Sequence, residues 1–417
     1  MTLNPEEMRK RRQQAALRRK AAQRRLMIRL GVLGVLLLAL ILILVFSLRA
    51  CGKKQETPTT TAANVTQESE PESTLPPTTV IHFAAAGDLN VTQRVVASGG
   101  AEYDYGEIFV DVAYLFADAD LAAINLEGNL CGAPYGSNAS APQSLMTALD
   151  YAGVDMVQLA NSYSINRGIS GLISTIDGVS QAGMEPLGVF RDQAEFDRKH
   201  GISLFEVQGV RIAVVSFTKG MDGTTLPPGN ESCVNVLYED YNSTYQTINE
   251  EKVKAVLTAA EQQKPDVTIA LLHWGSEYND TVSNSQEEIC EMLKKNGVDA
   301  IIGTHPHYVQ QVQMQDGTLI AYSLGDFIGD TPRSGTEYSI ILDIEITKDN
   351  TTGNTAVTGF TYTPIFTVAE SNQPIRVMRI REAIAAYEAG YIDAVSPETY
   401  EAMKYALERI DQRVAGK

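Results

Sequence analysis

The sequence predicts a layered α/β domain, and three observations support this fold class. Between residues 80 and 370, short apolar runs alternate with amphipathic helical patterns, which is the order expected of βα units. Polar residues stand directly after several of these runs, where the parallel strands of an α/β sheet end. The chain has 417 residues, of which 44% are hydrophobic, so it can form one large domain or two ordinary ones.

The expected strands and helices follow from the spacing of the apolar residues. Strands are expected at residues 81–86, 121–125, 156–160, 212–216, 267–272, 300–302 and 319–323. Helices are expected at residues 141–152, 169–182, 249–262 and 285–296. Two later segments, 338–347 and 355–368, alternate apolar and polar residues and are therefore expected to be antiparallel strands. The tail from 376 to 414 is largely helical in pattern.

The amino end predicts a membrane anchor. Residues 1–29 carry ten Lys or Arg, and residues 30–48 form an apolar run without a charge. Nineteen residues are about the minimum for a membrane-spanning helix, and the basic flank belongs on the cytoplasmic side. We therefore expect a cytoplasmic tail at 1–29, a single-pass anchor at 30–48 and an extracytoplasmic main domain. Residues 49–79, rich in Thr, Pro and Glu, are expected to form a disordered stalk.

A second interpretation of the amino end is a lipoprotein anchor. Residues 48–51 resemble a bacterial lipoprotein cleavage box in which Cys51 would be lipidated. Arg49 fits such a box poorly, and the basic leader is long for one, so the uncleaved anchor is favoured. The main domain, at residues 80–370, and a helical extension at 371–417 lie on the outer face in both interpretations.

Charge and cysteine content exclude several functions. The first 50 residues carry eleven basic and two acidic residues, so removing them from the formal charge of −17 leaves about −26. Such a surface repels nucleic acid and anionic lipid. Beyond Cys51, only Cys131, Cys233 and Cys290 remain, with no close pair, so neither a disulfide framework nor a thiolate zinc site is expected.

Polar side chains gather at the predicted carboxyl ends of the strands. Six segments supply them, in the order Asp88, Asn125 and Glu127, Asn161, His273, His305 and His307, and Asp326. Because these ends share one edge of a layered fold, we expect one site there. His305 and His307, two residues apart in extended backbone, would point the same way and hold one ion. Mixed carboxylate, amide and imidazole ligands suit a divalent pair such as Mn, Fe or Zn.

The chain resembles a known family at several motifs taken together. The matching segments are Ala86-Gly87-Asp88, Asn125-Leu126-Glu127, Leu159-Ala160-Asn161, Leu272-His273-Trp274-Gly275-Ser276-Glu277-Tyr278, Gly303-Thr304-His305-Pro306-His307 with Gln310, and Tyr322-Ser323-Leu324-Gly325-Asp326-Phe327. In this order, over roughly residues 80–370, they resemble the CapA/PgsA-type capsule synthesis proteins. That family is linked to poly-γ-glutamate capsules, and its fold is related to the calcineurin-like metallophosphoesterases.

The resemblance implies a fold and a set of ligands. The fold would be a two-sheet α/β sandwich of metallophosphoesterase type, with the site at one sheet edge. Six residues would ring a dinuclear metal centre, namely Asp88, Glu127, Asn161, His273, His305 and His307. Two metals would clamp phosphate-like oxygens and lower the pKa of a bound water.

The chain departs from the family pattern at the third strand. Where the family has Ala-Asn-Asn-His followed by Asp and Gly, this chain has Tyr163 for the histidine and Asn166 for the aspartate. The comparable histidine of the phosphoesterases is placed to protonate a leaving group, and tyrosine is a poor acid at neutral pH. Asp326 stands where the family usually has Asn. We therefore expect weakened or altered catalysis, with Tyr163 stacking on or hydrogen-bonding a ligand.

Further roles follow for the remaining residues near these motifs. Tyr163 and Glu277 are the candidate catalytic residues, and Glu277 could equally bind metal or cap the next helix. The candidate substrate contacts are Asn125, Trp274, Tyr278 and Asp326. Trp274, the only tryptophan, could instead pack in the core.

Three functions remain open at this point. The first is a membrane-tethered, metal-dependent hydrolase or transferase acting on an envelope polymer or its phosphorylated precursor. The second is a non-catalytic component of a capsule or poly-γ-glutamate export complex, whose metal site binds polymer carboxylates and whose amino end docks to membrane partners. The third is a phosphate-sensing or phosphate-scavenging surface protein. The departures at Tyr163 and Asn166 favour the second function, and the retained polar residues favour the first.

Overall fold

The computed structural model describes residues 76–329, 333–371, 373–391 and 395–417. The predicted tail at 1–29 and anchor at 30–48 lie outside these ranges. Within them, no helix combines the length and apolar character needed to cross a membrane. The predicted stalk lies almost entirely outside them too, but its last two residues, Thr78 and Thr79, already belong to the first strand and pair with Asp349 and Lys348.

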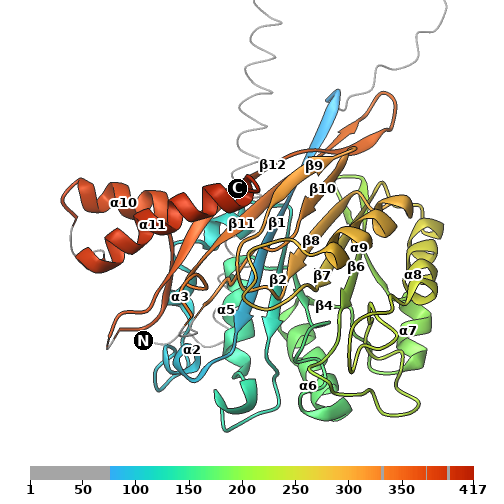
Figure 1. Ribbon diagram of the computed structural model, residues 1–417, viewed down its shortest axis with the longest axis horizontal. Helices are drawn as coiled ribbons and strands as arrows, with labels where there is room; N and C mark the ends of the chain where they lie inside the picture. Colours follow the sequence, from blue (N-terminus) through green and yellow to red (C-terminus); the bar gives the residue numbers. More distant parts are fainter. Residues whose placement is uncertain (1–75, 330–332, 372, 392–394) are drawn as a thin grey trace, which may run out of the picture. The chain divides into compact units, whose positions relative to one another are not determined.

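Two mixed β-sheets form the centre of the described chain (Figure 1). The first has the order β13-β12-β11-β1-β2-β3-β4 and the second the order β5-β6-β7-β8-β10-β9. The strands of the first sheet are β1 (Thr78–Asn90), β2 (Leu121–Glu127), β3 (Met156–Gln158), β4 (Glu185–Leu187), β11 (Tyr338–Asp349), β12 (Thr355–Val368) and β13 (Arg376–Arg379). Those of the second are β5 (Ile202–Val207), β6 (Val210–Thr218), β7 (Val267–His273), β8 (Ala300–Thr304), β9 (Val312–Gln315) and β10 (Thr318–Ala321).

Helices cover the outer face of each sheet, and the two C-terminal helices pack into the buried cluster that lies between the sheets. The larger ones are α5 (Gln143–Ala152), α6 (Gly168–Ala182), α8 (Glu250–Gln262), α9 (Asn284–Lys295), α10 (Ile380–Glu388) and α11 (Pro397–Val414). Short helices are α2 (Gln93–Ala97), α3 (Gly106–Phe109), α4 (Ala113–Ala117), α7 (Gln193–Lys199) and the 3-10 turn η1 (Ser137–Ala139). Their starts follow ordinary capping rules: at α9, Ser283 and Gln286 form a reciprocal capping box.

The core lies in layers. One buried cluster joins the two sheets, with Phe83 from β1 packed in the same cluster as Ile212 and Ile269 from β6 and β7. A second cluster lies between the first sheet and α5 and α6, and a third lies between the second sheet and α8 and α9. The arrangement is thus helix, sheet, sheet, helix, and it confirms the predicted two-sheet α/β sandwich.

The sequence located most of the elements, and the errors have local causes. All seven predicted strands and the two later antiparallel strands are present, and so are the four predicted helices. Strands β4, β5, β9 and β13 were missed. Residues 376–379 are a strand rather than the start of the helical tail, because they pair with β12 at Ile365 to Val368. These strands are short or at a sheet edge, where periodicity is a weak signal.

The strand ends bring the two sheets together at one place. Strands β1, β2 and β3 run parallel in the first sheet, and β6, β7 and β8 run parallel in the second. The backbone N–H of Asp88 donates to Gly325 O at 3.1 Å, which joins β1 to the turn after β10. A Cβ on Gly87 would lie 1.8 Å from Gly325 O, so only glycine permits this approach.

Candidate metal centre

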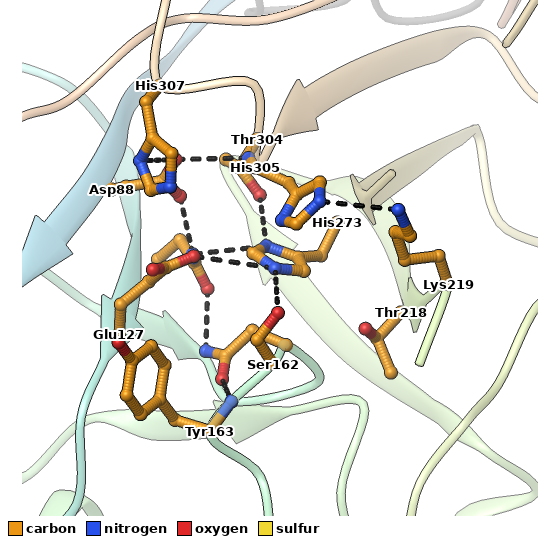
Figure 2. Close-up of polar contacts among 12 residues, drawn as sticks. Asp88, Glu127, Ser162, Tyr163, Thr218, Lys219, His273, Thr304, His305 and His307 are labelled. Atoms are coloured by element: carbon orange, nitrogen blue, oxygen red, sulfur yellow. Dashed lines mark hydrogen bonds and ion pairs between the residues drawn. The ribbon is translucent and has the colours of Figure 1, made fainter. Parts of the chain in front are cut away.

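Two groups of buried acidic and histidine side chains lie at these strand ends (Figure 2). The first group is Glu127, His273 and His305, and the second is Asp88, His307 and Asp326. Within each group, one ligand atom per residue lies within 4.8 Å of the others, and all six residues are buried. The three histidines that the sequence singled out are therefore brought together with three carboxylates from β1, β2 and the turn after β10.

The first group is oriented by hydrogen bonds to His273. Its Nδ1 lies 3.2 Å from the hydroxyl of Thr304, while its Nε2 lies 3.4 Å from Glu127 Oε1 and 3.2 Å from Ser162 Oγ. A proton on Nδ1, held by Thr304, leaves the Nε2 lone pair facing the carboxylate, which is the usual way a metal-binding histidine is set. The ring centroids of His273 and His305 lie 4.5 Å apart.

The second group is held by His307. Its Nδ1 lies 2.7 Å from Asp326 Oδ1 and 3.6 Å from Asp88 Oδ2. The backbone N–H of His305 donates to the same oxygen of Asp88 at 3.0 Å. Asp326, expected from sequence as a substrate contact, is instead a buried partner of His307.

His305 and His307 belong to different groups, which corrects the expectation that both would hold one ion. Their backbone is not extended: φ is +93° at His305 and +60° at His307. The rings therefore do not share the common direction of alternate residues in a strand, and their centroids lie 6.2 Å apart.

Two amide side chains link the groups. Asn125 donates to Asp88 Oδ1 at 2.6 Å, and its amide nitrogen lies 3.5 Å from His273 Nδ1. Asn161 donates to Asn125 Oδ1 at 2.9 Å and to Leu126 O at 2.7 Å, and its own oxygen accepts from the N–H of Tyr163. An amide oxygen has two lone pairs, so one remains for a ligand. Asn125 is fully buried, so it acts through these neighbours rather than as a surface contact for substrate.

Burial shifts the pKa values of most side chains in this cluster toward their neutral forms. Burial raises the pKa of Asp88, and burial together with the charge of Asp88 raises the pKa of Glu127 well above its usual range. Burial also lowers the pKa values of His273 and His305 far below the usual range. Although burial opposes the charge on His307, its hydrogen bond with Asp326 and the nearby carboxylates raise its pKa to about 10.

Unpaired buried atoms point to a missing partner. Among the described residues, Glu127 Oε1, His305 Nδ1 and Asp326 Oδ2 are buried without a hydrogen bond. Leaving a buried polar atom unpaired costs about 1–3 kcal/mol. Each of these atoms is a ligand type that divalent transition metals accept, and both groups contribute at least one. The residues present therefore fit a divalent cation in each group.

Three predicted residues lie at the edge of the cluster. Tyr163 is half-buried beside Glu127, and burial and the Glu127 charge raise its pKa, so its hydroxyl keeps the proton. Tyr278 stacks on His307 with ring centroids 5.1 Å apart, beneath the guanidinium of Arg333 at 3.9 Å. Glu277 is exposed, near enough for its charge to act on Glu127.

Trp274 does not face the cluster, which corrects its expected role as a substrate contact. It is fully buried in the third core cluster, stacked on Tyr322. Its indole N–H donates to Tyr322 O at 2.9 Å. No part of the ring is left for a substrate.

Sequence reasoning missed three polar neighbours of the histidines. Ser162 and Thr304 stand beside predicted ligands and contact His273. Lys219 directly follows β6, the one predicted strand of the two parallel sets to which the sequence assigned no polar residue, and its Nζ lies 3.4 Å from His305 Nε2. The rule that found the others, a polar residue directly after a strand, would have found Lys219 as well.

The chain is similar in sequence to capsule proteins of bacilli. It is 27% identical over 292 residues to the PGA biosynthesis protein CapA of Bacillus subtilis, covering 67% of this chain and 71% of that protein. It is also 27% identical over 220 residues to the capsule biosynthesis protein CapA of Bacillus anthracis, covering 51% of this chain and 49% of that protein.

Two solved structures align with much of the chain at low sequence identity. The calcineurin-like phosphoesterase YfkN from Bacillus subtilis aligns with 81% of this chain and 98% of its own, at 14% identity and a TM-score of 0.46. A phosphatase from Mycoplasma pneumoniae aligns with 69% of this chain and 94% of its own, at 14% identity and a TM-score of 0.42.

A comparison of the chain with models of protein families shows which family it belongs to. The family described as "Bacterial capsule synthesis protein PGA_cap" matches residues 82–331, a range that begins in β1 and contains all six residues of the two groups. The matched range is more than half of the 417-residue chain. This protein therefore belongs to the bacterial capsule synthesis protein family, as the CapA-type motifs of its sequence indicated.

Proposed function

We propose that this protein is a membrane-tethered, extracytoplasmic component of capsule polymer synthesis or export that uses two divalent metal ions to hold anionic groups of poly-γ-glutamate or of its precursor. The observation that carries the proposal is the pair of adjacent buried groups with unpaired ligand atoms. The family supports the polymer, because the curated relatives are named for capsule or PGA biosynthesis.

Each of the two groups would hold one ion. Glu127, His273 and His305 would hold one, and Asp88, His307 and Asp326 the other. When bound, such ions supply Lewis acidity toward an anionic oxygen and lower the pKa of a bound water. Thr304 keeps His273 in the tautomer that ligation needs, and Asn125 fixes the orientation of Asp88.

Residue 163 favours binding over turnover. A general acid works best when its pKa lies near the working pH, and burial moves the pKa of Tyr163 further above that range. Asn166 is exposed and has no carboxylate with which to orient a neighbour. Tyr163 therefore acts as a neutral hydroxyl donor beside Glu127.

The second candidate function is a metal-dependent hydrolase acting on an envelope polymer or its phosphorylated precursor. The observation in its favour is that three buried histidines and three carboxylates form two ligand groups. The two functions share the same ions and differ in whether a bond is broken.

Location follows from the amino end. We propose that residues 30–48 cross the membrane with residues 1–29 in the cytoplasm, and that the described domain lies outside. The alternative is lipidation at Cys51. The partners are then the polymer and the membrane components of the synthesis complex, and nucleic acid is excluded by the negative charge of the exported part.

The test is made in a capsule-forming strain that lacks its own member of the family. Expression of this chain is expected to restore cell-associated poly-γ-glutamate, and the Glu127→Gln/Asp88→Asn double variant, with one carboxylate removed from each group, is not. The length of the poly-γ-glutamate in the medium distinguishes the two functions. Polymer that is shortened by the wild type but not by the double variant indicates hydrolysis. Equal restoration by wild type and double variant contradicts a role for the metal groups.

A further inference from the structure

Lys219 places a positive charge beside the first metal group. It directly follows β6, and its Nζ donates to Gly275 O at 2.8 Å and lies 3.4 Å from His305 Nε2. The ammonium also lies 4.5 Å from the centre of the Tyr245 ring. The residue is partly exposed, whereas His305 is buried, so Lys219 stands at the open side of this group. In the described chain it forms no ion pair with a carboxylate.

The two nitrogens of His305 have different surroundings. Nδ1 is buried and has no hydrogen-bond partner among the described residues, and Nε2 faces Lys219 (Figure 2). A neutral imidazole has one protonated nitrogen and one lone pair. If the unpaired Nδ1 gives its lone pair to a cation shared with Glu127 and His273, the proton of the ring stands on Nε2.

This tautomer leaves two donors facing each other. Both Nε2–H of His305 and the ammonium of Lys219 then carry hydrogens across a separation of 3.4 Å, and neither can accept from the other. Gly275 O accepts one hydrogen of the ammonium, and among the described residues no other oxygen accepts from it. What satisfies both donors is an oxygen acceptor between or above them, and a negatively charged oxygen does so most strongly.

We propose that Lys219 and the Nε2 edge of His305 form a subsite for an anionic oxygen of the substrate, supplied by a phosphoryl group or by a γ-glutamyl carboxylate. The inference rests on the proposed metal function. It adds which part of the substrate, an anionic oxygen, would lie beside the ligand set of Glu127, His273 and His305. It assigns Lys219 as a residue that binds substrate.

The neighbouring charges allow this assignment. The acidic side chains whose charges act on Lys219 are Glu277 and Asp222, and both are exposed. Their charges are screened by water, whereas the partly buried ammonium of Lys219 is screened less. A purely structural lysine that pins the turn at Gly275 would affect stability without affecting anion affinity, so the two roles can be separated by experiment.

The experiment uses the full-length chain purified in neutral detergent and loaded with Mn²⁺. Binding of inorganic phosphate and of penta-γ-glutamate is measured by calorimetry for wild type, Lys219→Met and Lys219→Arg. Lys254→Met is the matched control, because Lys254 is an exposed helical lysine paired with Glu250. Metal content and thermal unfolding are recorded on the same samples.

We expect Lys219→Met to lower the affinity for the preferred anion at least about tenfold, which corresponds to the loss of one charge-assisted hydrogen bond. The metal content should not change. Lys219→Arg should retain most of the affinity, and Lys254→Met all of it. Tighter binding of inorganic phosphate indicates that the anionic oxygen comes from a phosphoryl group, and tighter binding of penta-γ-glutamate indicates a carboxylate. Unchanged anion affinity in a folded Lys219→Met protein, or a wild type that binds neither anion, overturns the inference. A wild type that holds no metal contradicts the proposed function separately.

Discussion

His305 and His307 stand two residues apart in the chain, yet they serve different halves of the site. Their rings are 6.2 Å apart, with His305 beside His273 and His307 bonded to Asp326. Both histidines have left-handed backbone and Pro306 lies between them, so the short segment directs the two imidazole rings into different ligand groups. One loop thus supplies a ligand to each metal group, and a change in its backbone would disturb both.

Glu127→Gln should stabilise the metal-free protein while weakening metal binding. Burial and the charge of Asp88 raise the pKa of Glu127, so folding takes up a proton there. Stability contributed by this group is therefore lost as pH rises above the unfolded value of about 4.3, and the neutral glutamine avoids that loss. In chelator at pH 8, each kcal/mol relieved raises the unfolding midpoint by about 2–4 °C.

The same series carries its own controls. The advantage of Glu127→Gln should shrink as pH falls toward the unfolded value of about 4.3, because the raised pKa of Glu127 lets the folded wild type take up the proton first. Added Mn²⁺ should raise the midpoint of wild type far more than that of the variant, because a ligand stabilises only the form that binds it. A variant that is less stable than wild type in chelator at pH 8 would show that Glu127 is satisfied without a cation.

Restoring the family's histidine tests whether residue 163 limits catalysis. Tyr163→His/Asn166→Asp should raise the hydrolysis of a phosphoester with a poor leaving group, such as glycerol phosphate, because a positioned general acid is worth about 10²–10⁴-fold. Released phosphate is measured with Mn²⁺ present, and Tyr163→Phe is the control that removes the hydroxyl without supplying an acid. Wild-type turnover equal to that of the double variant would mean that Tyr163 does not weaken catalysis.

Gly87→Ala should damage the site through the backbone. Its Cβ would lie 1.8 Å from Gly325 O, so β1 or the turn after β10 must shift, at a cost of about 1–3 kcal/mol. Asp88 moves with it, and metal affinity should fall as well. Gly359→Ala is the matched control, since its Cβ would meet nothing within 4 Å. Denaturant midpoints and metal content are measured, and similar midpoints for the two variants would rule out the close approach.

The amino end is tested in whole bacteria. If residues 30–48 form the uncleaved anchor that we propose, the full chain should resist alkaline extraction from membranes, and Cys51→Ser should leave both its size and its membrane association unchanged. Immunoblots of the two fractions report the result. A wild-type protein shorter than the Cys51→Ser protein by about 50 residues would establish the lipoprotein alternative.

Much of this fold was predictable from the sequence, because its central strands are continuous apolar runs. β7 is buried along its whole length and was located within one residue, and the polar residues at the ends of β1, β2, β7 and β8 do lie together. The edge strand β5 was missed because its exposed and buried residues give a weak pattern. The three-residue β4, with Pro186 in its middle, gives almost none.

The division of ligands into two groups was not predictable. It depends on the left-handed backbone at His305 and His307, and the spacing of apolar residues in the sequence gives no sign of such a backbone. The burial of Trp274 depends on the close approach of Gly303 to its indole, where a Cβ would lie 2.3 Å from the indole nitrogen. Lys219 was overlooked because a single lysine after a strand resembles an ordinary surface residue until its distance to His305 is known.

The most direct measurement is the metal content of the full-length chain and of its single histidine variants. After supplementation with Mn, Zn and Fe, elemental analysis should find about two ions per wild-type chain, because there are two ligand groups. His305→Ala and His307→Ala should each keep about one ion, and the double variant none. His200→Asn, at an exposed histidine outside both groups, should match wild type. A wild type without metal, or loss of all metal in either single variant, would contradict the two-group site.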